Sequence, residues 1–411
     1  MKKCLILLLM LLMCLSGCGT LSQSDEISIV LLHGWGTMEE DNQAMREIYS
    51  EFEKDNPDIS LKLISMPSPE NVTSKVKEMI SVGKLPNLIY IGETGIDTLY
   101  SFMVTQGYVI DIMPYIEKDK EFQSMIAPET LMKWKTADGK LYTVTDVLNT
   151  GGYWYNKQIF ENAKIQKTPE NWKEFLECCK KIKQWAEQEK LDTVSMHLDY
   201  NTIECMMQSY KCMMQSYIGD TDSDEKSISE ALKLLNEIKD YADVEKNYTY
   251  RDRLRSFNVG HSAIYAGGID SEQKINPKLK MEYAMFPDKN NKDVAMVSAY
   301  PGYFIGSSSD TKQKEACIRF LKYMLSEKVQ TKIWKKTGQI PSNPNVNIAD
   351  LSGQNDVIYE AYAKLKKADI IRELPGNDWD FEQREEFEAN IFRYLSGDIS
   401  EDEIVDSLKS K

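Results

Sequence analysis

The sequence lacks most of the motifs on which catalysis or metal binding usually depends. Only three histidines occur among its 411 residues, and it contains no G-x-G-x-x-G turn, Walker loop, H-E-x-x-H helix or EF-hand loop. The cysteines form no C-x-x-C pair, which argues against zinc fingers and against a disulfide framework. We therefore expect no cofactor, no metal ion and no catalytic residue.

Basic residues are also in deficit. The chain has 50 Lys and Arg against 64 Asp and Glu, a formal net charge of −14. Nucleic acids and anionic lipids bind through basic patches, so neither is expected as a partner. After residue 18, no apolar run is long enough to form a membrane-spanning helix, which excludes a pore or a permease.

The first 18 residues form a distinct segment. Lys2 and Lys3 precede an apolar run over residues 5–15, which is too short to span a bilayer but typical of a signal-peptide core. The following Leu15-Ser16-Gly17-Cys18 resembles the lipobox of bacterial lipoproteins. That resemblance implies a signal peptide at 1–17, acyl chains such as palmitate on Cys18, and an acylated tether over 18–25. Two acyl chains would anchor the protein stably on the extracytoplasmic face of the cell membrane.

Five cysteines remain beyond this segment, because Cys4 and Cys14 would leave with the signal peptide and Cys18 would be acylated. An odd count without framework spacing favours free thiols packed in helices.

The N-terminal part alternates between strand and helix patterns. Strands are predicted at 27–32, 59–64 and 88–91, with helices at 41–54 and 72–82, and this alternation is typical of a parallel α/β layer structure. Ligands of such sheets bind beyond the carboxyl ends of the strands. Trp35 and Glu93 follow two of these strands and are therefore candidate site residues.

The middle of the chain, residues 171–240, is mostly helical in pattern. No low-complexity linker separates it from the first part, so we expect two domains connected by strands. A mature length of roughly 390 residues also favours two domains over one.

Two sequence fragments suggest an esterase. His33-Gly34-Trp35-Gly36 resembles an oxyanion loop, and Gly260-His261-Ser262 resembles the start of a nucleophile elbow. Ile264 replaces the second elbow glycine, however, and no histidine follows Ser262 to act as the base. This hypothesis is therefore rejected, whereas a glycosidase stays open because 64 acidic residues guarantee carboxylate pairs by chance.

A family resemblance is carried by segments in a fixed order. They are Leu85-Pro86-Asn87-Leu88, Gly139-Lys140-Leu141-Tyr142-Thr143-Val144, Gly152-Tyr153-Trp154-Tyr155-Asn156-Lys157, Phe257-Asn258-Val259-Gly260, Gly338-Gln339-Ile340-Pro341 and Gly397-Asp398-Ile399-Ser400. Together they resemble family 1 extracellular solute-binding proteins of bacterial ABC importers, the sugar-binding lipoproteins related to maltose-binding protein.

The resemblance implies an α/β, two-lobed periplasmic-binding-protein-like fold of type II with a hinge between the lobes. We expect an N-terminal lobe of residues 26–146 plus 284–326 and a C-terminal lobe of residues 147–283 plus 327–411. The chain would cross between the lobes near 145–149, near Ala284 and after a helix that ends around Leu325. Ligand would be held between the lobes, which close by hinge bending.

Sugar rings stack on aromatic side chains, and their hydroxyl groups suit short amides and carboxylates. Eight residues at predicted loop and crossing positions meet these demands: Trp35, Glu93, Asn149, Trp154, Asp270, Tyr300, Tyr303 and Trp379.

The predicted function is that of a monomeric, non-enzymatic, membrane-anchored binding lipoprotein that captures a carbohydrate and delivers it to ABC permease subunits. Two alternatives stay open. One is a ligand-sensing lipoprotein coupled to a sensor kinase, and the other is a surface glycosidase.

Overall fold

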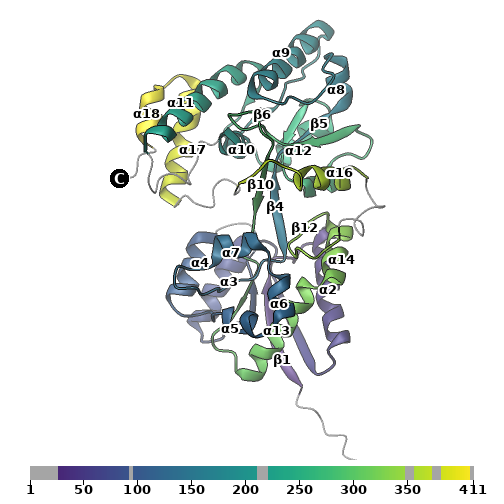
Figure 1. The fold of residues 1–411 in the computed structure, drawn as a ribbon, viewed down its shortest axis with the longest axis vertical. Coiled ribbons are helices and arrows are strands. Elements are labelled where there is room, and N and C mark those ends of the chain that lie inside the picture. The colour runs from purple at the N-terminus through teal and green to yellow at the C-terminus, as the bar shows by residue number, and fades with distance from the viewer. Residues whose placement is uncertain (1–25, 92–95, 211–220, 348–355, 373–380, 408–411) are drawn as a thin grey trace, which may run out of the picture.

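The computed structural model describes residues 26–91, 96–210, 221–347, 356–372 and 381–407. These residues form two lobes, each with helices around a central sheet, joined by a pair of long strands (Figure 1). The predicted two-lobed α/β fold is confirmed. We name the lower body in Figure 1 the N-terminal lobe and the upper body the C-terminal lobe.

The sheet of the N-terminal lobe has the order β11-β3-β1-β2. Its strands are β1 (Ile27–His33), β2 (Ile59–Ser65), β3 (Leu88–Tyr90) and β11 (Tyr303–Ile305). Strand β1 runs parallel to β2 and β3, while β11 is antiparallel to β3. The carboxyl ends of the three parallel strands point toward the other lobe (Figure 1), so the loops that follow them lie at the interlobe face.

Helices cover this sheet because their apolar residues recur every three or four positions. In α2 (Glu40–Asp55), Met45, Ile48, Tyr49 and Phe52 are all buried. The other helices of the lobe are α3 (Pro69–Ser81), α4 (Ile96–Thr105), α5 (Met113–Lys118), α6 (Lys120–Met125), α7 (Pro128–Trp134), α13 (Thr311–Leu325) and α14 (Glu327–Thr337).

A second sheet, with the order β12-β4-β10-β13, connects the lobes. It consists of β4 (Val147–Gly151), β10 (Val294–Ser298), β12 (Ile340–Pro341) and β13 (Ile370–Arg372). Strand β4 pairs antiparallel with both β10 and β12. The second crossing therefore lies at β10 and not near Ala284, which ends a strand inside the C-terminal lobe.

The third crossing also differs from the expectation that residues from 327 onward belong to the C-terminal lobe. Helix α14 packs on α2, with ion pairs from Lys332 to Glu51 and from Lys336 to Glu47. Its Val329 side chain belongs to the core of the N-terminal lobe. Ile333 belongs to the same core, whereas Trp334 packs against Tyr362 of the C-terminal lobe, with ring centroids 5.4 Å apart. Helix α14 thus belongs mainly to the N-terminal lobe, and the chain leaves this lobe at β12.

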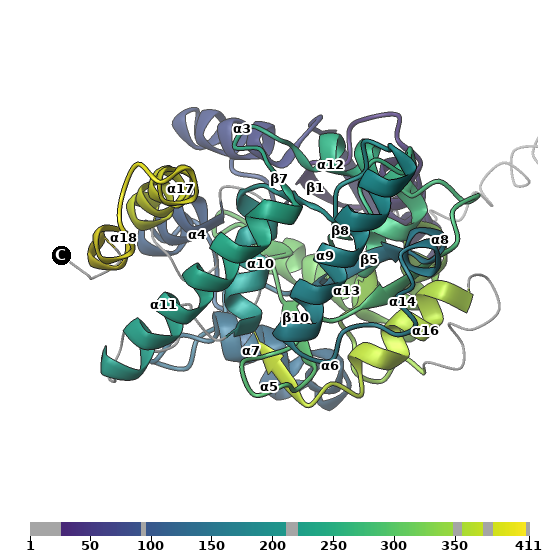
Figure 2. The ribbon, with the colours of Figure 1, turned by 90° about the horizontal axis from the view of Figure 1, so that it is seen from above.

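The C-terminal lobe is built on the antiparallel sheet β8-β5-β9, formed by β8 (Ile264–Ala266), β5 (Tyr153–Asn156) and β9 (Met281–Ala284). A short parallel pair, β6 (His197–Leu198) and β7 (Asp243–Val244), lies beside it. The helical elements of this lobe are α8 (Lys157–Asn162), α9 (Trp172–Glu189), α10 (Tyr200–Tyr210), α11 (Thr221–Ile238), η1 (Lys239–Tyr241), α12 (Tyr250–Asn258), η2 (Ile269–Lys274), α16 (Asp356–Leu365), α17 (Phe381–Ser396) and α18 (Glu401–Ser407). Helices α17 and α18 lie next to α11 at one side of the lobe (Figure 2).

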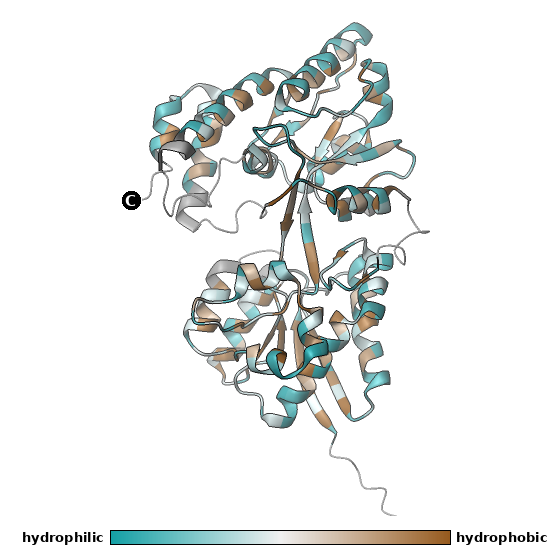
Figure 3. Cartoon of the chain, viewed as in Figure 1, coloured by the Kyte–Doolittle hydropathy of each residue, from teal (hydrophilic) through white to brown (hydrophobic). Residues whose placement is uncertain are grey.

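Apolar residues follow the strands and the inward faces of the helices, whereas the outer helix surfaces are hydrophilic (Figure 3). No helix in the described part of the chain is long and apolar enough to cross a membrane. Cys178, Cys179 and Cys317 are buried and unpaired, and Cys205 is partly buried and also unpaired, as the cysteine spacing predicted. The fifth cysteine, Cys212, and the lipidation residue Cys18 lie outside the described residues.

Candidate functional site

The loop after β1 is fixed by the buried imidazole of His33. Its Nδ1 accepts a hydrogen bond from the backbone N–H of Trp35 at 3.0 Å, so Nε2–H donates to Ser65 Oγ, also at 3.0 Å. Burial, with a smaller contribution from the Arg46 guanidinium, lowers the pKa of His33 to about 4. The ring is therefore neutral at physiological pH and serves to hold the loop in place.

Trp35 is held by this loop at the interlobe end of the sheet. Its indole is half-buried and lies against Tyr90, with ring centroids 5.5 Å apart. The Arg46 guanidinium donates to the carbonyl oxygens of Trp35 and Thr37. A Cβ on Gly36 would lie 2.5 Å from Met66 O, so only glycine fits there. The indole therefore has packing of its own, because the Tyr90 ring lies against it at an interplanar angle of 34°.

A chain of hydroxyl groups lies below this aromatic pair. Tyr49 and Tyr303 share a hydrogen bond of 2.9 Å, and the Tyr303 hydroxyl donates to Asp146 Oδ2 at 3.0 Å. Burial raises the pKa of Asp146 to about 7. Tyr303 is fully buried, with its ring 4.7 Å from that of Tyr90. Its predicted role as a ligand contact does not fit this position, because inward-facing strand residues join the core.

In the C-terminal lobe, the turn after β8 carries the predicted site residue Asp270. Thr150 Oγ1 accepts a hydrogen bond from the backbone N–H of Ile269 at 3.0 Å. A Cβ on Gly268 would lie 2.8 Å from Thr150 O and 2.4 Å from Asp270 Oδ1. The absence of a side chain at Gly268 therefore allows this turn to approach β4 closely.

Trp154 supports this turn from inside the lobe. Its side chain is fully buried, packs edge-on against Tyr283 with centroids 5.1 Å apart, and donates from Nε1 to Gly268 O at 2.9 Å. The prediction that Trp154 contacts the ligand does not fit this geometry. It positions the turn that carries Asp270, which is a structural role.

Asp270 of the C-terminal lobe interacts electrostatically with Asp41, which lies in the first turn of α2 in the N-terminal lobe. Burial raises the pKa of the Asp41 carboxyl, Lys274 lowers it, and the Asp270 carboxylate raises it again. Burial likewise raises the pKa of Asp270, and Lys274 opposes that rise. Asp41 and Asp270, which come from opposite lobes, are thus both influenced by the charge of Lys274. Carboxylates of this kind can accept hydrogen bonds from a polyhydroxylated molecule.

A groove of about 530 Å³ extends from this point between α2 and α12. Glu39 on one side and Arg251 on the other form an ion pair at 3.5 Å across it. We name it the interlobe groove; the residues that line it include Glu39, Glu40, Asp41, Tyr250, Arg251 and Lys274.

Two predicted residues lie on the connecting strands. Asn149, in β4, is half-buried and pairs with Ser298 of β10. Tyr300, just after β10, is half-buried, and its carbonyl oxygen accepts a hydrogen bond from Thr145 Oγ1 at 2.7 Å. Glu93 and Trp379 lie outside the described residues.

Sequence reasoning missed Tyr90, Asp41 and Lys274. Tyr90 was within reach of that reasoning, because it lies in the last two residues of the predicted strand at 88–91, and Trp35 follows closely after the predicted strand at 27–32. Asp41 and Lys274 gave no such signal. Acidic residues are common at the start of a helix, and a single lysine is usually a solvated surface charge. Ser262, the rejected esterase nucleophile, is 1% exposed and so is closed to substrate.

A comparison with protein-family models matches residues 47–365 to the bacterial extracellular solute-binding proteins. Among curated proteins, a multiple sugar-binding protein of Streptococcus mutans is 22% identical over 338 residues, 77% of this chain and 76% of that protein.

Solved structures share the fold. A Streptococcus pneumoniae solute-binding protein, determined in complex with the blood group A-trisaccharide, superimposes with a TM-score of 0.74 at 20% identity and covers 93% of this chain and 98% of its own. The sugar-binding protein MalE of Xanthomonas citri also has a TM-score of 0.74, at 18% identity, with 93% and 95% covered. A Listeria monocytogenes substrate-binding protein in complex with cycloalternan has a TM-score of 0.72 at 20% identity, with 94% and 97% covered.

Proposed function

The chain belongs to the family of bacterial extracellular solute-binding proteins, and from that premise we propose that it captures a carbohydrate between its lobes for delivery to an ABC importer. Members of this family bind a substrate without transforming it, and they act outside the cytoplasm. The curated and structural relatives named above are described as sugar-binding or were solved with oligosaccharides, which supports the ligand class.

The observation that carries this proposal is the partly exposed Trp35 indole, which packs at a tilt against Tyr90 and is fixed through its backbone by His33 and Arg46. A sugar presents an apolar C–H face to such an aromatic platform. Asp41 and Asp270 lie across the lobes, where they would accept hydrogen bonds from hydroxyl groups. The two carboxylates also disfavour an anionic ligand. We therefore place an uncharged sugar between Trp35 and this carboxylate pair.

The proposal includes a location. A signal peptide at residues 1–17 and acylation of Cys18 would hold the protein on the outer face of the membrane, next to its permease. The variant Cys18→Ala should be unprocessed or released, and it should leave the detergent phase in a partitioning assay. Partitioning of the variant at the wild-type level would contradict the anchor without touching the ligand site.

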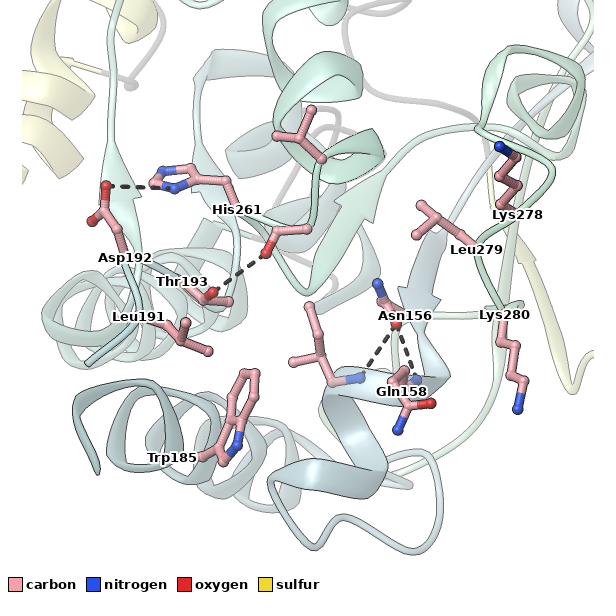
Figure 4. Close-up of a pocket in the computed structure, with 13 residues that line it drawn as sticks. Asn156, Gln158, Trp185, Leu191, Asp192, Thr193, His261, Lys278, Leu279 and Lys280 are labelled. Atoms are coloured by element: carbon pink, nitrogen blue, oxygen red, sulfur yellow. Dashed lines mark hydrogen bonds and ion pairs between the residues drawn. The ribbon is translucent and has the colours of Figure 1, made fainter. Parts of the chain in front are cut away.

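The ligand proposal is tested by titrating the purified protein calorimetrically with a panel of mono- and oligosaccharides. For the sugar that binds, Trp35→Ala should raise the Kd by roughly 5-fold to 150-fold, equivalent to about 1–3 kcal/mol. Trp185→Ala is the matched control, because Trp185 is another half-buried tryptophan but lines a different pocket, formed by residues of the C-terminal lobe alone (Figure 4). Its Kd should equal that of the wild type.

An unchanged Kd in Trp35→Ala would place the sugar elsewhere. Release of reducing sugar during incubation with the bound oligosaccharide would identify a glycosidase instead. Binding should also reduce the radius of gyration, since hinge closure brings the lobes together.

A further inference from the structure

We propose that the C-terminal lobe contains a site for a divalent transition-metal ion, Zn²⁺ in the first place, formed by His197, Asp243 and His261. One ligand atom from each of these side chains lies within 4.8 Å of the others. The three residues are distant in sequence but come together where β6, β7 and the bend before β8 meet. None of them lines the interlobe groove, so the site is independent of the proposed sugar site.

The backbone brings two of the three side chains together. His197 and Asp243 are directly paired in the parallel strands β6 and β7, and His197 Nδ1 lies 3.4 Å from Asp243 Oδ2. His261 stacks its ring on that of His197, with centroids 5.7 Å apart. The donor set is thus two imidazoles and one carboxylate, a combination that zinc accepts.

The state of the His197 imidazole points to a missing ligand. The residue is only 2% exposed, and its Nδ1 has no hydrogen-bond partner within the described residues. A buried polar atom that makes no hydrogen bond destabilises the fold, and a metal ion bound to Nδ1 would remove this penalty.

The other nitrogen of His197 is already fixed. Nε2 lies 2.6 Å from Ser256 Oγ, and in the tautomer that leaves a lone pair on Nδ1 for the metal, Nε2–H donates to this hydroxyl. Metal-binding histidines usually have such a partner, which orients the ring.

A second carboxylate lies at the rim of the site. His261 Nδ1 is 3.7 Å from Asp192 Oδ2 (Figure 4). His261 and Asp243 are both partly exposed, so an ion reaches the site from solvent, and water completes the coordination shell.

The geometry requires only a small rearrangement. Zinc binds imidazole nitrogen and carboxylate oxygen at about 2.0–2.2 Å in a tetrahedral arrangement, so its ligand atoms lie about 3.3–3.6 Å apart. Side-chain rotation in the partly exposed His261 and Asp243 is sufficient to contract the set from 4.8 Å.

The test is a calorimetric titration of the untagged, chelator-dialysed full chain with ZnCl₂ alone. We expect one ion per chain with low-micromolar or tighter affinity. Asp243→Asn and His261→Gln should each weaken binding at least about 10-fold. These two positions are chosen because the buried His197 is the ligand whose replacement most endangers folding. Glu245→Gln is the matched control, because Glu245 is a carboxylate two residues beyond Asp243 and is likewise partly exposed. This variant should bind as the wild type does.

Cobalt gives a second readout, since Co²⁺ bound by two imidazoles in a four-coordinate site produces visible absorption that Asp243→Asn should diminish. The absence of saturable Zn²⁺ binding would overturn the proposal. Equal binding by the wild type and both ligand variants would also overturn it, because the ion would then sit elsewhere. Sugar affinity should be the same with and without Zn²⁺, so a failure here leaves the proposed function standing.

Discussion

The two lobes bury their polar groups in different ways. The N-terminal lobe has one apolar core around a mainly parallel sheet, and its buried imidazole, His33, is satisfied on both ring nitrogens. The C-terminal lobe has two apolar clusters around short strands. Between its elements it buries the Arg253–Asp199 ion pair and the unpartnered nitrogen of His197.

This difference indicates that buried polar groups have different roles in the two lobes. In the N-terminal lobe, the polar groups of His33 and Arg46 fix the loop at the interlobe face that carries Trp35, the residue on which we propose that the ligand stacks. In the C-terminal lobe, polar groups hold together elements that the apolar clusters alone do not connect. We expect the C-terminal lobe to be the more sensitive of the two to loss of a buried charge.

The largest effect is expected for Arg253→Met. Arg253 Nε lies 2.9 Å from Asp199 Oδ2, both side chains are at most 7% exposed, and Nη1 donates to Ala266 O at 2.7 Å. Removal of the guanidinium leaves a buried carboxylate without its counter-ion, which should lower the free energy of unfolding by about 3–5 kcal/mol. Urea unfolding at pH 7 measures this loss.

The matched control for that prediction is Arg319→Met in the N-terminal lobe. Arg319 pairs with Asp58 at 2.7 Å, but both side chains are at least 40% exposed. This change should therefore cost no more than about 1 kcal/mol. Equal losses in the two variants would contradict the contrast between the lobes.

The second effect is a pH dependence that belongs to the N-terminal lobe. The pKa of His33 falls from 6.5 to about 4 on folding, so the unfolded chain takes up a proton that the folded chain does not. This stabilising contribution is fully present above pH 6.5 and is lost as the pH falls toward 4. Between pH 7 and 4.5, wild type should lose about 2–3 kcal/mol more stability than His33→Asn.

Urea unfolding of both proteins at the two pH values provides the measurement. Asparagine is chosen because it does not titrate and its Oδ1 can still accept the Trp35 N–H. Identical pH profiles for wild type and variant would show that the imidazole is not held neutral by burial.

The third effect compares one closely packed glycine from each lobe, Gly36 and Gly268. In Gly36→Ala the new Cβ would lie 2.5 Å from Met66 O, and in Gly268→Ala it would lie 2.8 Å from Thr150 O. Each substitution should cost about 1–3 kcal/mol of stability, because backbone atoms must move. Thermal unfolding checks the cost, and a melting temperature equal to that of the wild type would mean that the loop relaxes freely.

The smallest effect concerns the contact between the lobes. Arg251 and Glu39 are 3.5 Å apart, with side chains 72% and 59% exposed. Arg251→Gln should change the unfolding free energy by less than about 0.5 kcal/mol, because solvent screens an exposed pair. A larger loss by urea unfolding would mean that the lobes stabilise each other through this contact.

The N-terminal sheet was largely predictable from the sequence. The predicted strands at 27–32 and 59–64 end within one residue of β1 and β2, and the predicted helix at 41–54 corresponds to α2. These elements have strong apolar periodicity and clear stops such as Pro57, so local pattern and final structure agree. Strands β6 and β7 were not predictable in the same way, because two residues are too few to show the alternation of apolar and polar side chains that identifies a strand.

The candidate site was predictable only in part. The strand pattern places Trp35 at the interlobe face, and the structure agrees. The strand pattern does not show whether an aromatic residue points to the ligand or into the core when both faces of the strand are buried. For that reason Trp154 and Tyr303, which are both fully buried, were predicted to contact the ligand. The proposed metal ligands were missed because His197 and Asp243 meet only through strand pairing.

The strands between the lobes have a mechanical consequence. Strand β4 is hydrogen-bonded on one side to β10 and on the other to β12, so all three passages of the chain form one ribbon. A ribbon of sheet bends readily out of its plane, whereas bending within the plane stretches the hydrogen bonds along one edge. The lobes therefore have one soft direction of relative motion. If the proposed interlobe ligand closes the lobes along this direction, the elastic work of bending the ribbon enters its binding free energy.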